Sequence, residues 1–312
     1  MNMELYNTMQ NHGYIPPQNV QTGKITRFAA PNKPKSNRSA WLIINQGDHG
    51  QYAAFGNWST SEKYTWTENS KPISHEEKAV LYQKIEMEIE QLRLEKLRKI
   101  QTAGKLVTGI LKYASPVNKN DKHPYLVRKK VTSYGLYRMR YLKGISDNYL
   151  YNINDALLIP MQSFSKETAA EYQSMQIIAP DGSKRFLANS VLNGGHFFIR
   201  KPNDSYKILI CEGYATGATL AEIRSKYAVV CAFNAGNLKK VAESVRANYP
   251  VHDVIIAGDN DRHLEKKGQM NVGKVKAEEA AKLVGGSVFI PEFKPEENGT
   301  DWNDYCCSRG LL

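Results

Sequence analysis

The chain has 312 residues, with 42 Lys or Arg against 31 Asp or Glu, so its formal net charge is +11. A hydrophobic content of 41% fits globular domains, and no run of about 18 apolar residues predicts a membrane span. The first residues lack the apolar core of a signal peptide, and four cysteines without a CxxC pair argue against a disulfide framework and a zinc ribbon. We therefore expect a cytoplasmic protein without zinc or membrane contact, and the excess base favours nucleic acid as a partner.

Residues 1–70 have the pattern of a small, basic, β-rich domain. Residues 5–61 contain five Lys or Arg and a single acidic residue, Asp48. Apolar runs predict strands at 25–29, 40–45 and 51–55. Basic and aromatic side chains on short strands are typical of single-stranded nucleic-acid binding, although most of these rings could instead form the core of the domain. The candidate nucleic-acid contacts here are Lys24, Arg27 and Trp58.

Residues 71–115 predict a helical connector. Apolar residues recur on one face of a long charged segment, which favours a helix over 73–103. Gly104 then predicts a break before a second helix at 105–113. Such an arm serves either oligomerisation and partner contact or solvated packing between domains, and the sequence leaves both open.

Residues 116–205 predict a mixed α+β subdomain. Strands are expected at 156–160 and 175–180, and Asp181-Gly182 is a hairpin turn signal. Two basic residues, Lys184 and Arg185, follow this turn and are candidates for contacting phosphate, because guanidinium and ammonium groups both bind it. A short segment upstream carries a second basic cluster of candidate nucleic-acid contacts, made of Arg128, Lys129 and Lys130.

Residues 206–312 alternate strand and helix patterns, which predicts a parallel sheet with helices on its faces. The apolar run 207–211 ends at Glu212, and the run 254–257 leads to Asp259 and Asp261. In such sheets ligands bind beyond the carboxyl ends of the strands. Three carboxylates meeting there repel each other unless a cation neutralises them, and their hard oxygen atoms select Mg²⁺ or Mn²⁺. The overall fold class predicted is thus α/β (α+β overall).

This last region contains the sequence segments CEGYATGATL, CAFNAGNL, AGDND and TDWND. Through these segments it resembles the Toprim domain, in the version found in plasmid- and phage-encoded DNA primases. The resemblance covers about residues 207–304, and the N-terminal GKITRF and FGNW words are similar to the beginning of such primases. It implies template-directed synthesis of short RNA primers on single-stranded DNA from NTPs, with Mg²⁺ or Mn²⁺. Because no GxxxxGK[ST] motif occurs, a separate replicative helicase is a further expected partner.

The resemblance also implies roles for single residues. Asp259 and Asp261 would hold the metal ions, and Glu212 would either complete the metal shell or take the proton of the attacking 3′-hydroxyl. Lys184 and Arg185 would neutralise phosphate. Asp304 is assigned to the metal set, with a helix N-cap at Asp301 as the competing explanation of the TDWND word.

Two other functions remain open at this point. A Toprim-type nuclease would use the same carboxylates with water as the nucleophile. A non-catalytic single-stranded DNA binding protein would bind without metal and without dependence on Glu212.

Overall fold

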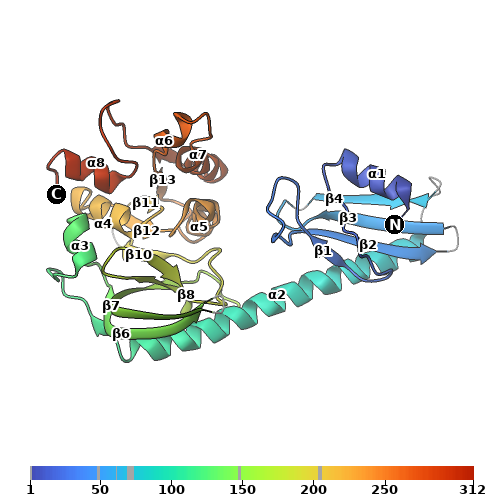
Figure 1. Cartoon of the computed structure of the whole chain (residues 1–312), viewed down its shortest axis with the longest axis horizontal. Coiled ribbons are helices and arrows are strands. Elements are labelled where there is room, and N and C mark those ends of the chain that lie inside the picture. The colour runs from blue at the N-terminus through green and yellow to red at the C-terminus, as the bar shows by residue number, and fades with distance from the viewer. Residues whose placement is uncertain (1, 48–49, 61, 69–73, 147–148, 203–205) are drawn as a thin grey trace. The chain divides into compact units, whose positions relative to one another are not determined.

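The computed structural model describes residues 2–47, 50–60, 62–68, 74–146, 149–202 and 206–312. These residues divide into two compact units, Met1–Glu95 and Lys96–Leu312, and their elements are labelled in Figure 1. The predicted domain boundary at residue 70 lies outside the described residues, and the boundaries at 115 and 205 both fall within the second unit.

The first unit is built on an antiparallel sheet in the order β1-β2-β3-β4. Its strands are β1 (Thr26–Phe28), β2 (Ala40–Gly47), β3 (Gly50–Asn57) and β4 (Glu62–Thr67). Helix α1 (Met3–Asn11), which the sequence did not predict, buries Leu5 and Met9 against one face of the sheet. The opposite face packs on the first half of α2 through Ile85.

Helix α2 runs without interruption from His75 to Leu111. The break predicted at Gly104 is therefore wrong, and the reason is packing. A Cβ atom on Gly104 would lie 2.5 Å from the backbone oxygen of Tyr172 and 2.8 Å from Cβ of Ala170. Glycine at this position allows the helix to approach the neighbouring sheet closely, which in this case outweighs its poor helix propensity.

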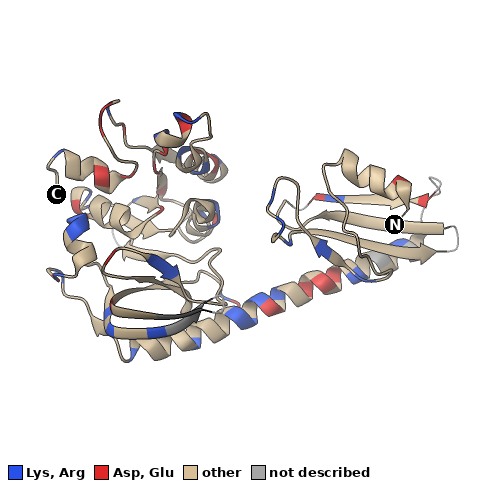
Figure 2. Cartoon of the chain, viewed as in Figure 1, with Lys and Arg blue, Asp and Glu red and all other residues tan. Residues whose placement is uncertain are grey.

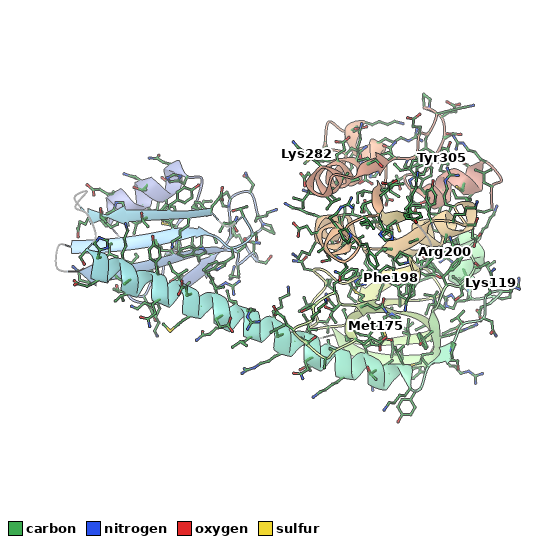
Figure 3. The ribbon with its side chains drawn as sticks, turned by 180° about the vertical axis from the view of Figure 1, so that it is seen from behind. Lys119, Met175, Phe198, Arg200, Lys282 and Tyr305 are labelled. Atoms are coloured by element: carbon green, nitrogen blue, oxygen red, sulfur yellow. The ribbon has the colours of Figure 1, made fainter. Side chains whose placement is uncertain are left out.

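The second unit contains an antiparallel sheet in the order β5-β6-β7-β8-β9. Its strands are β5 (Ser115–Pro116), β6 (Tyr137–Ser146), β7 (Tyr149–Gln162), β8 (Tyr172–Ile178) and β9 (Lys184–Phe186). One face packs on the second half of α2, where Met175 lies in a cluster with Val107 (Figure 3). The other face packs, with α3 (Pro124–Lys129), against the second sheet of this unit.

That second sheet has the order β10-β12-β11-β13-β14. Its strands are β10 (Phe197–Arg200), β11 (Lys207–Cys211), β12 (Ala228–Cys231), β13 (Asp253–Ala257) and β14 (Ser287–Phe289). Strand β10 is antiparallel to β12, whereas β12, β11, β13 and β14 pair in parallel. The predicted α/β fold with a parallel sheet is confirmed.

Helices cover both faces of the parallel sheet (Figure 1). They are α4 (Tyr214–Ile223) and α8 (Trp302–Ser308) on one face, and α5 (Ala235–Asn248) and α7 (Val272–Val284) on the other, with short α6 (Arg262–Glu265) after β13. Residues 208 and 210 of β11 therefore enter one core and residues 209 and 211 the other, which explains the continuous apolar run. Arg200, labelled in Figure 3, donates to backbone oxygens of Ala221 and Tyr227 and so fixes the end of α4.

Candidate active site

The carboxylates predicted from the sequence gather at the C-terminal edge of the parallel sheet. Cys211 of β11 is the register partner of Ala257 of β13, so Glu212 and Asp259 follow adjacent strand ends. Backbone hydrogen bonds from Asp259 and Ala235 reach the carboxylate of Glu212. The parallel register thus brings together two residues that are 47 positions apart in the printed sequence.

Burial changes the acidity of both groups. Desolvation, followed by the charges of Asp261 and Asp301, raises the pKa of Glu212 to about 7. Desolvation and the charges of Glu212, Asp301 and Asp261 raise the pKa of Asp259 to about 9. Within the described part of the chain, Oε1 of Glu212 and Oδ1 of Asp259 are buried without a hydrogen-bond partner. Two carboxylate oxygen atoms at this edge are therefore left for a ligand or a cation.

Asp261 is held in place by the N-terminus of α7. Its Oδ2 accepts a hydrogen bond from the backbone N–H of Gly273 at 2.9 Å, and its own N–H donates to Oδ1 of Asn271 at 2.9 Å. Asn271 also caps α7 by accepting from the N–H of Lys274. A Cβ atom on Gly273 would lie 2.5 Å from the backbone oxygen of Asp259, so the close approach of the loop and the helix requires glycine there.

The two aspartates of the TDWND segment have different hydrogen-bond partners. Asp301 is the N-cap of α8 and accepts from the N–H of Asp304 at 2.7 Å, and its charge is among those that raise the pKa of Asp259. Burial raises the pKa of Asp301 itself, and Lys129 opposes this shift. Asp304 instead accepts from the N–H of Thr300 at 3.2 Å and lies 3.4 Å from Nζ of Lys129. Asp301, and not Asp304, is thus among the charges that raise the pKa of Asp259, although both aspartates lie near Nζ of Lys129, at 3.8 Å and 3.4 Å.

Lys184 supplies positive charge to the same site. It is the register partner of Ile178, which belongs to the core shared with the parallel sheet. Its charge lowers the pKa of Asp259 and of Asp301, and its Nζ lies 5.9 Å from the ring centre of Tyr125.

Arg185, the next residue on β9, is turned to the other face. It is the register partner of Ile177, which belongs to the cluster beneath α2. Successive side chains of a strand point to opposite faces, so the two adjacent basic residues do not share a site. The structure brings Lys184 to the carboxylates and does not bring Arg185.

The basic cluster of α3 lies along the same side of the second unit, where Figure 2 shows it as basic residues on one short helix. Lys129 lies 3.8 Å from Oδ2 of Asp301, and Arg128 donates to the backbone oxygen of Pro180 in the turn before β9. Lys130 ends the helix in the left-handed conformation and is exposed. The side chain of Asn303 donates to the backbone oxygen of Lys129, which ties α3 to α8.

The N-terminal candidates belong to the first unit. Arg27 is exposed on β1, where its Nε donates to the backbone oxygen of Arg38 at 2.9 Å, and Lys24 is exposed just before β1. Trp58 stacks on Trp41 with ring centres 4.8 Å apart. Arg27 and Trp41 are register partners and so share a face of the sheet.

No metal centre is formed by the described residues alone, because no three His, Cys, Asp or Glu side chains among them are arranged to hold an ion. The donor chemistry still fits a hard divalent cation, since the unpartnered oxygen atoms of Glu212 and Asp259 are carboxylate oxygens. All four cysteines are free thiols. Among the helices of the described residues, none is long and apolar enough to cross a membrane.

Comparison with known proteins agrees with this geometry. Residues 207–311 match the Toprim domain family. Two Escherichia coli proteins, both named DNA primase TraC, are 44% identical over 129 residues and 43% identical over 128 residues, which is 40% of this chain in each case. These matches cover 12% and 9% of the relatives, so the chain spans a small part of their length.

Solved primase structures show weaker likeness. The DnaG primase catalytic domain bound to single-stranded DNA matches with a TM-score of 0.44 and 12% identity, over 68% of this chain and 78% of that one. The primase fragment of the bacteriophage T7 primase-helicase matches with a TM-score of 0.42 and 16% identity, over 62% and 76%. The sequence matches confirm the resemblance of this region: residues 207–311 match the Toprim domain family, and part of the chain is similar to proteins named DNA primase TraC.

Proposed function

We propose that this chain is a DNA primase that synthesises short RNA primers from NTPs on a single-stranded DNA template. The observation that carries the proposal is the edge of the parallel sheet, where Glu212 and Asp259 are buried with unpartnered oxygen atoms opposite Lys184. Phosphoryl transfer needs this combination of negative groups for cations and positive groups for phosphate. The relatives named DNA primase TraC support the same assignment.

Mg²⁺ or Mn²⁺ would be held by Glu212, Asp259 and Asp261. Asp301 is a better fourth candidate than Asp304, since its charge acts on Asp259. When bound, the cation would stabilise the charge that develops on the attacking and leaving oxygen atoms. Its binding would also lower the pKa of both buried carboxyls, because it favours their ionised forms.

The remaining steps fall to the chain's own residues. Lys184 would bind the triphosphate of the incoming NTP as a point charge, and the exposed Arg128 and Lys130 would bind phosphates of the template. Oε1 of Glu212 is buried without a hydrogen-bond partner among the described residues, so it is available to accept a proton. Oε1 of Glu212 would therefore take the proton of the primer 3′-hydroxyl whenever that oxygen does not ligate the cation.

Primer synthesis can be tested directly. The full chain is incubated with single-stranded DNA, labelled NTPs and Mg²⁺, and the products are resolved on a sequencing gel. We expect short labelled RNA that requires both template and divalent cation. Template cleavage without incorporation would show a Toprim-type nuclease instead, and DNA binding with neither product would show a binding protein. The separate replicative helicase stays a prediction of the sequence.

A further inference from the structure

A row of side chains crosses the sheet of the first unit on the face that meets α2. Arg27 of β1 pairs with Trp41 of β2, Trp41 pairs with Gly56 of β3, and Gly56 pairs with Lys63 of β4. Directly paired residues of antiparallel strands point to the same face. The row thus has a cation at each end and an aromatic ring between them, and with strands about 4.8 Å apart it spans about 14 Å.

A pocket of about 290 Å³ opens beside this row, between the sheet and α2. Trp41, Trp58, Tyr82 and Ile85 form its walls, so its surface is mainly aromatic and apolar. Trp41 is 2% exposed and belongs to the core, whereas Trp58 stacks on it and is only partly buried. We call this feature the Trp58 pocket.

The polar groups of the pocket are arranged for a ligand with both donors and acceptors. Nε1 of Trp58 is buried and has no acceptor among the described residues, although buried N–H groups normally find one. Lys63 and Glu86 both line the pocket, and Nζ of Lys63 lies 3.6 Å from the ring centre of Tyr82. A planar ring that accepts from an indole N–H and donates to a carboxylate fits these walls, and nucleobases have this chemistry.

The charges decide between a free nucleotide and a nucleic-acid strand. Within the pocket two carboxylates, Glu62 and Glu86, outweigh the positive charge of Lys63, which leaves no net positive charge for a triphosphate. Positive charge lies outside the pocket. Residues 5–61 contain five Lys or Arg, Arg27 among them, and one acidic residue. A base inside and phosphates outside is the arrangement expected for single-stranded DNA.

We propose that the Trp58 pocket binds one base of single-stranded DNA by stacking on Trp58, while Arg27 contacts the neighbouring phosphates. The inference rests on the proposed primase function for the identity of the strand as its template. It goes beyond that function in giving the first unit a base-binding site of its own, separate from the carboxylates.

Tryptophan fluorescence of the full chain tests the proposal independently of catalysis. The four tryptophans are Trp41, Trp58, Trp66 and Trp302. We expect an oligo-dT to quench the emission, and Trp58→Phe to remove most of that quenching. Trp66→Phe is the matched control, because Trp66 lies in the cluster beneath α1 on the other face, and it keeps the quenching. Quenching that persists unchanged in Trp58→Phe would overturn the proposal.

Affinity gives a second readout that does not disturb the stacked rings. Ile89 lines the pocket and is 46% exposed, and Met87 is 52% exposed on the same helix but does not line it. Loss of one base–aromatic stack weakens binding by about 5- to 150-fold. Ile89→Glu, which obstructs the pocket with a negative charge, should weaken oligo-dT binding at least about fivefold more than Met87→Glu. Equal effects of these two variants would contradict a base in the pocket.

Two further measurements distinguish a failure of the base-binding proposal from a failure of the proposed primase function. Asp259→Asn should retain the quenching by oligo-dT, so that loss of primer synthesis and loss of base binding are scored separately. Single NTPs and dNTPs at the same base concentration should quench much less than the oligonucleotide. Equal quenching by mononucleotides would instead show a free-nucleotide site and reject the strand-binding proposal.

Discussion

The sheet of the first unit and the parallel sheet of the second present their functional side chains in different ways. In the first unit Arg27, Trp41 and Lys63 lie across a sheet face, and the strand register determines which residues are neighbours. In the second, Glu212 and Asp259 follow the ends of β11 and β13, beyond the last paired residues. A face offers a broad surface on which rings and cations are spread, whereas a strand edge concentrates buried charge at one point.

Under the proposed function, this difference separates recognition of the template from chemistry. The two cations of the face, Arg27 and Lys63, are exposed and suit phosphate contact, which needs little change in acidity. The residues of the edge are buried, and burial together with neighbouring carboxylates raises the pKa of Glu212 and of Asp259. The following experiments test whether the two regions can be disabled separately.

The largest expected effect is on the edge. Asp259→Asn should reduce primer synthesis at least about a thousandfold, equivalent to about 4 kcal/mol in the activation free energy, because a principal cation ligand is lost. Asp253→Asn, at the opposite end of the same strand and exposed, is the matched control and should keep near-normal activity. Labelled-NTP incorporation measures both, and similar losses in the two variants would refute the assignment of the C-terminal edge.

Glycine substitutions should destabilise one region at a time. A Cβ atom on Gly56 would collide with the backbone oxygen of Glu62 in the first unit, and one on Gly217 would collide with Ile199 and lie 2.8 Å from Sγ of Cys211 in the second. Each change to Ala should cost about 3 kcal/mol locally. Hydrogen exchange should rise in the sheet of the substituted unit.

The control for this pair is Gly109→Ala in α2, where a Cβ atom would meet nothing within 4 Å. It should leave exchange in both sheets unchanged or lower it slightly, because alanine favours a helix over glycine by about 1 kcal/mol. Increased exchange in both sheets after either core substitution would show that the two units do not respond separately.

Removal of divalent cations should make the second unit sensitive to alkaline pH. The folded carboxyls of Glu212 and Asp259, with pKa values raised to about 7 and about 9, bind protons that the unfolded chain releases near pH 4. The free energy of unfolding should therefore fall as pH rises from about 4 to about 9. Urea unfolding in EDTA measures this slope, and Asp259→Asn should flatten it.

Mg²⁺ should reverse that loss. It binds the ionised carboxylates of the folded state, so its stabilising effect should be larger at pH 9 than at pH 5. Equal stabilisation at the two pH values would indicate that the cation binds elsewhere on the chain.

The smallest expected effect on primer synthesis comes from substitutions of two neighbouring residues of β9. Lys184→Gln should lower primer synthesis about tenfold or more, the usual worth of a hydrogen bond to a charged group. Arg185→Gln removes the same charge one position further along β9 and should lower it less than about threefold, because that side chain lies on the other face. The ratio of the two rates in the incorporation assay is the measurement, and a ratio near one would contradict the register.

The edge of the parallel sheet was largely predictable from the sequence. Buried strands have continuous apolar runs in the sequence, and the carboxylates follow them closely, so the sequence alone predicts β11 and the position of Glu212 at its end. The choice between Asp301 and Asp304 was not predictable, because it depends on a helix cap and on Lys129, which is distant in sequence. The assignment of Asp304 as a ligand consequently stays a prediction, and the effect of the Asp301 charge on the pKa of Asp259 favours Asp301.

Elements with weaker patterns were missed. Strand β6 alternates Tyr137 and Met139 with Arg138 and Arg140, a period of two that predicts a strand once it is looked for. Helix α1 buries only Leu5 and Met9, too few positions to establish a period. The Trp58 pocket depends on long-range register and on packing of α2, which no local pattern contains.

Strand β9 is only three residues long, so its pairing with β8 depends on the number of residues in the turn between them. The backbone N–H of Ala179 donates to the backbone oxygen of Ser183. This hydrogen bond closes a turn of defined length between β8 and β9. Insertion or deletion of one residue there would exchange the faces of Lys184 and Arg185. The turn should accordingly tolerate changes in the identity of Asp181 or Ser183 across evolution while rejecting changes in length, although it lies at the surface.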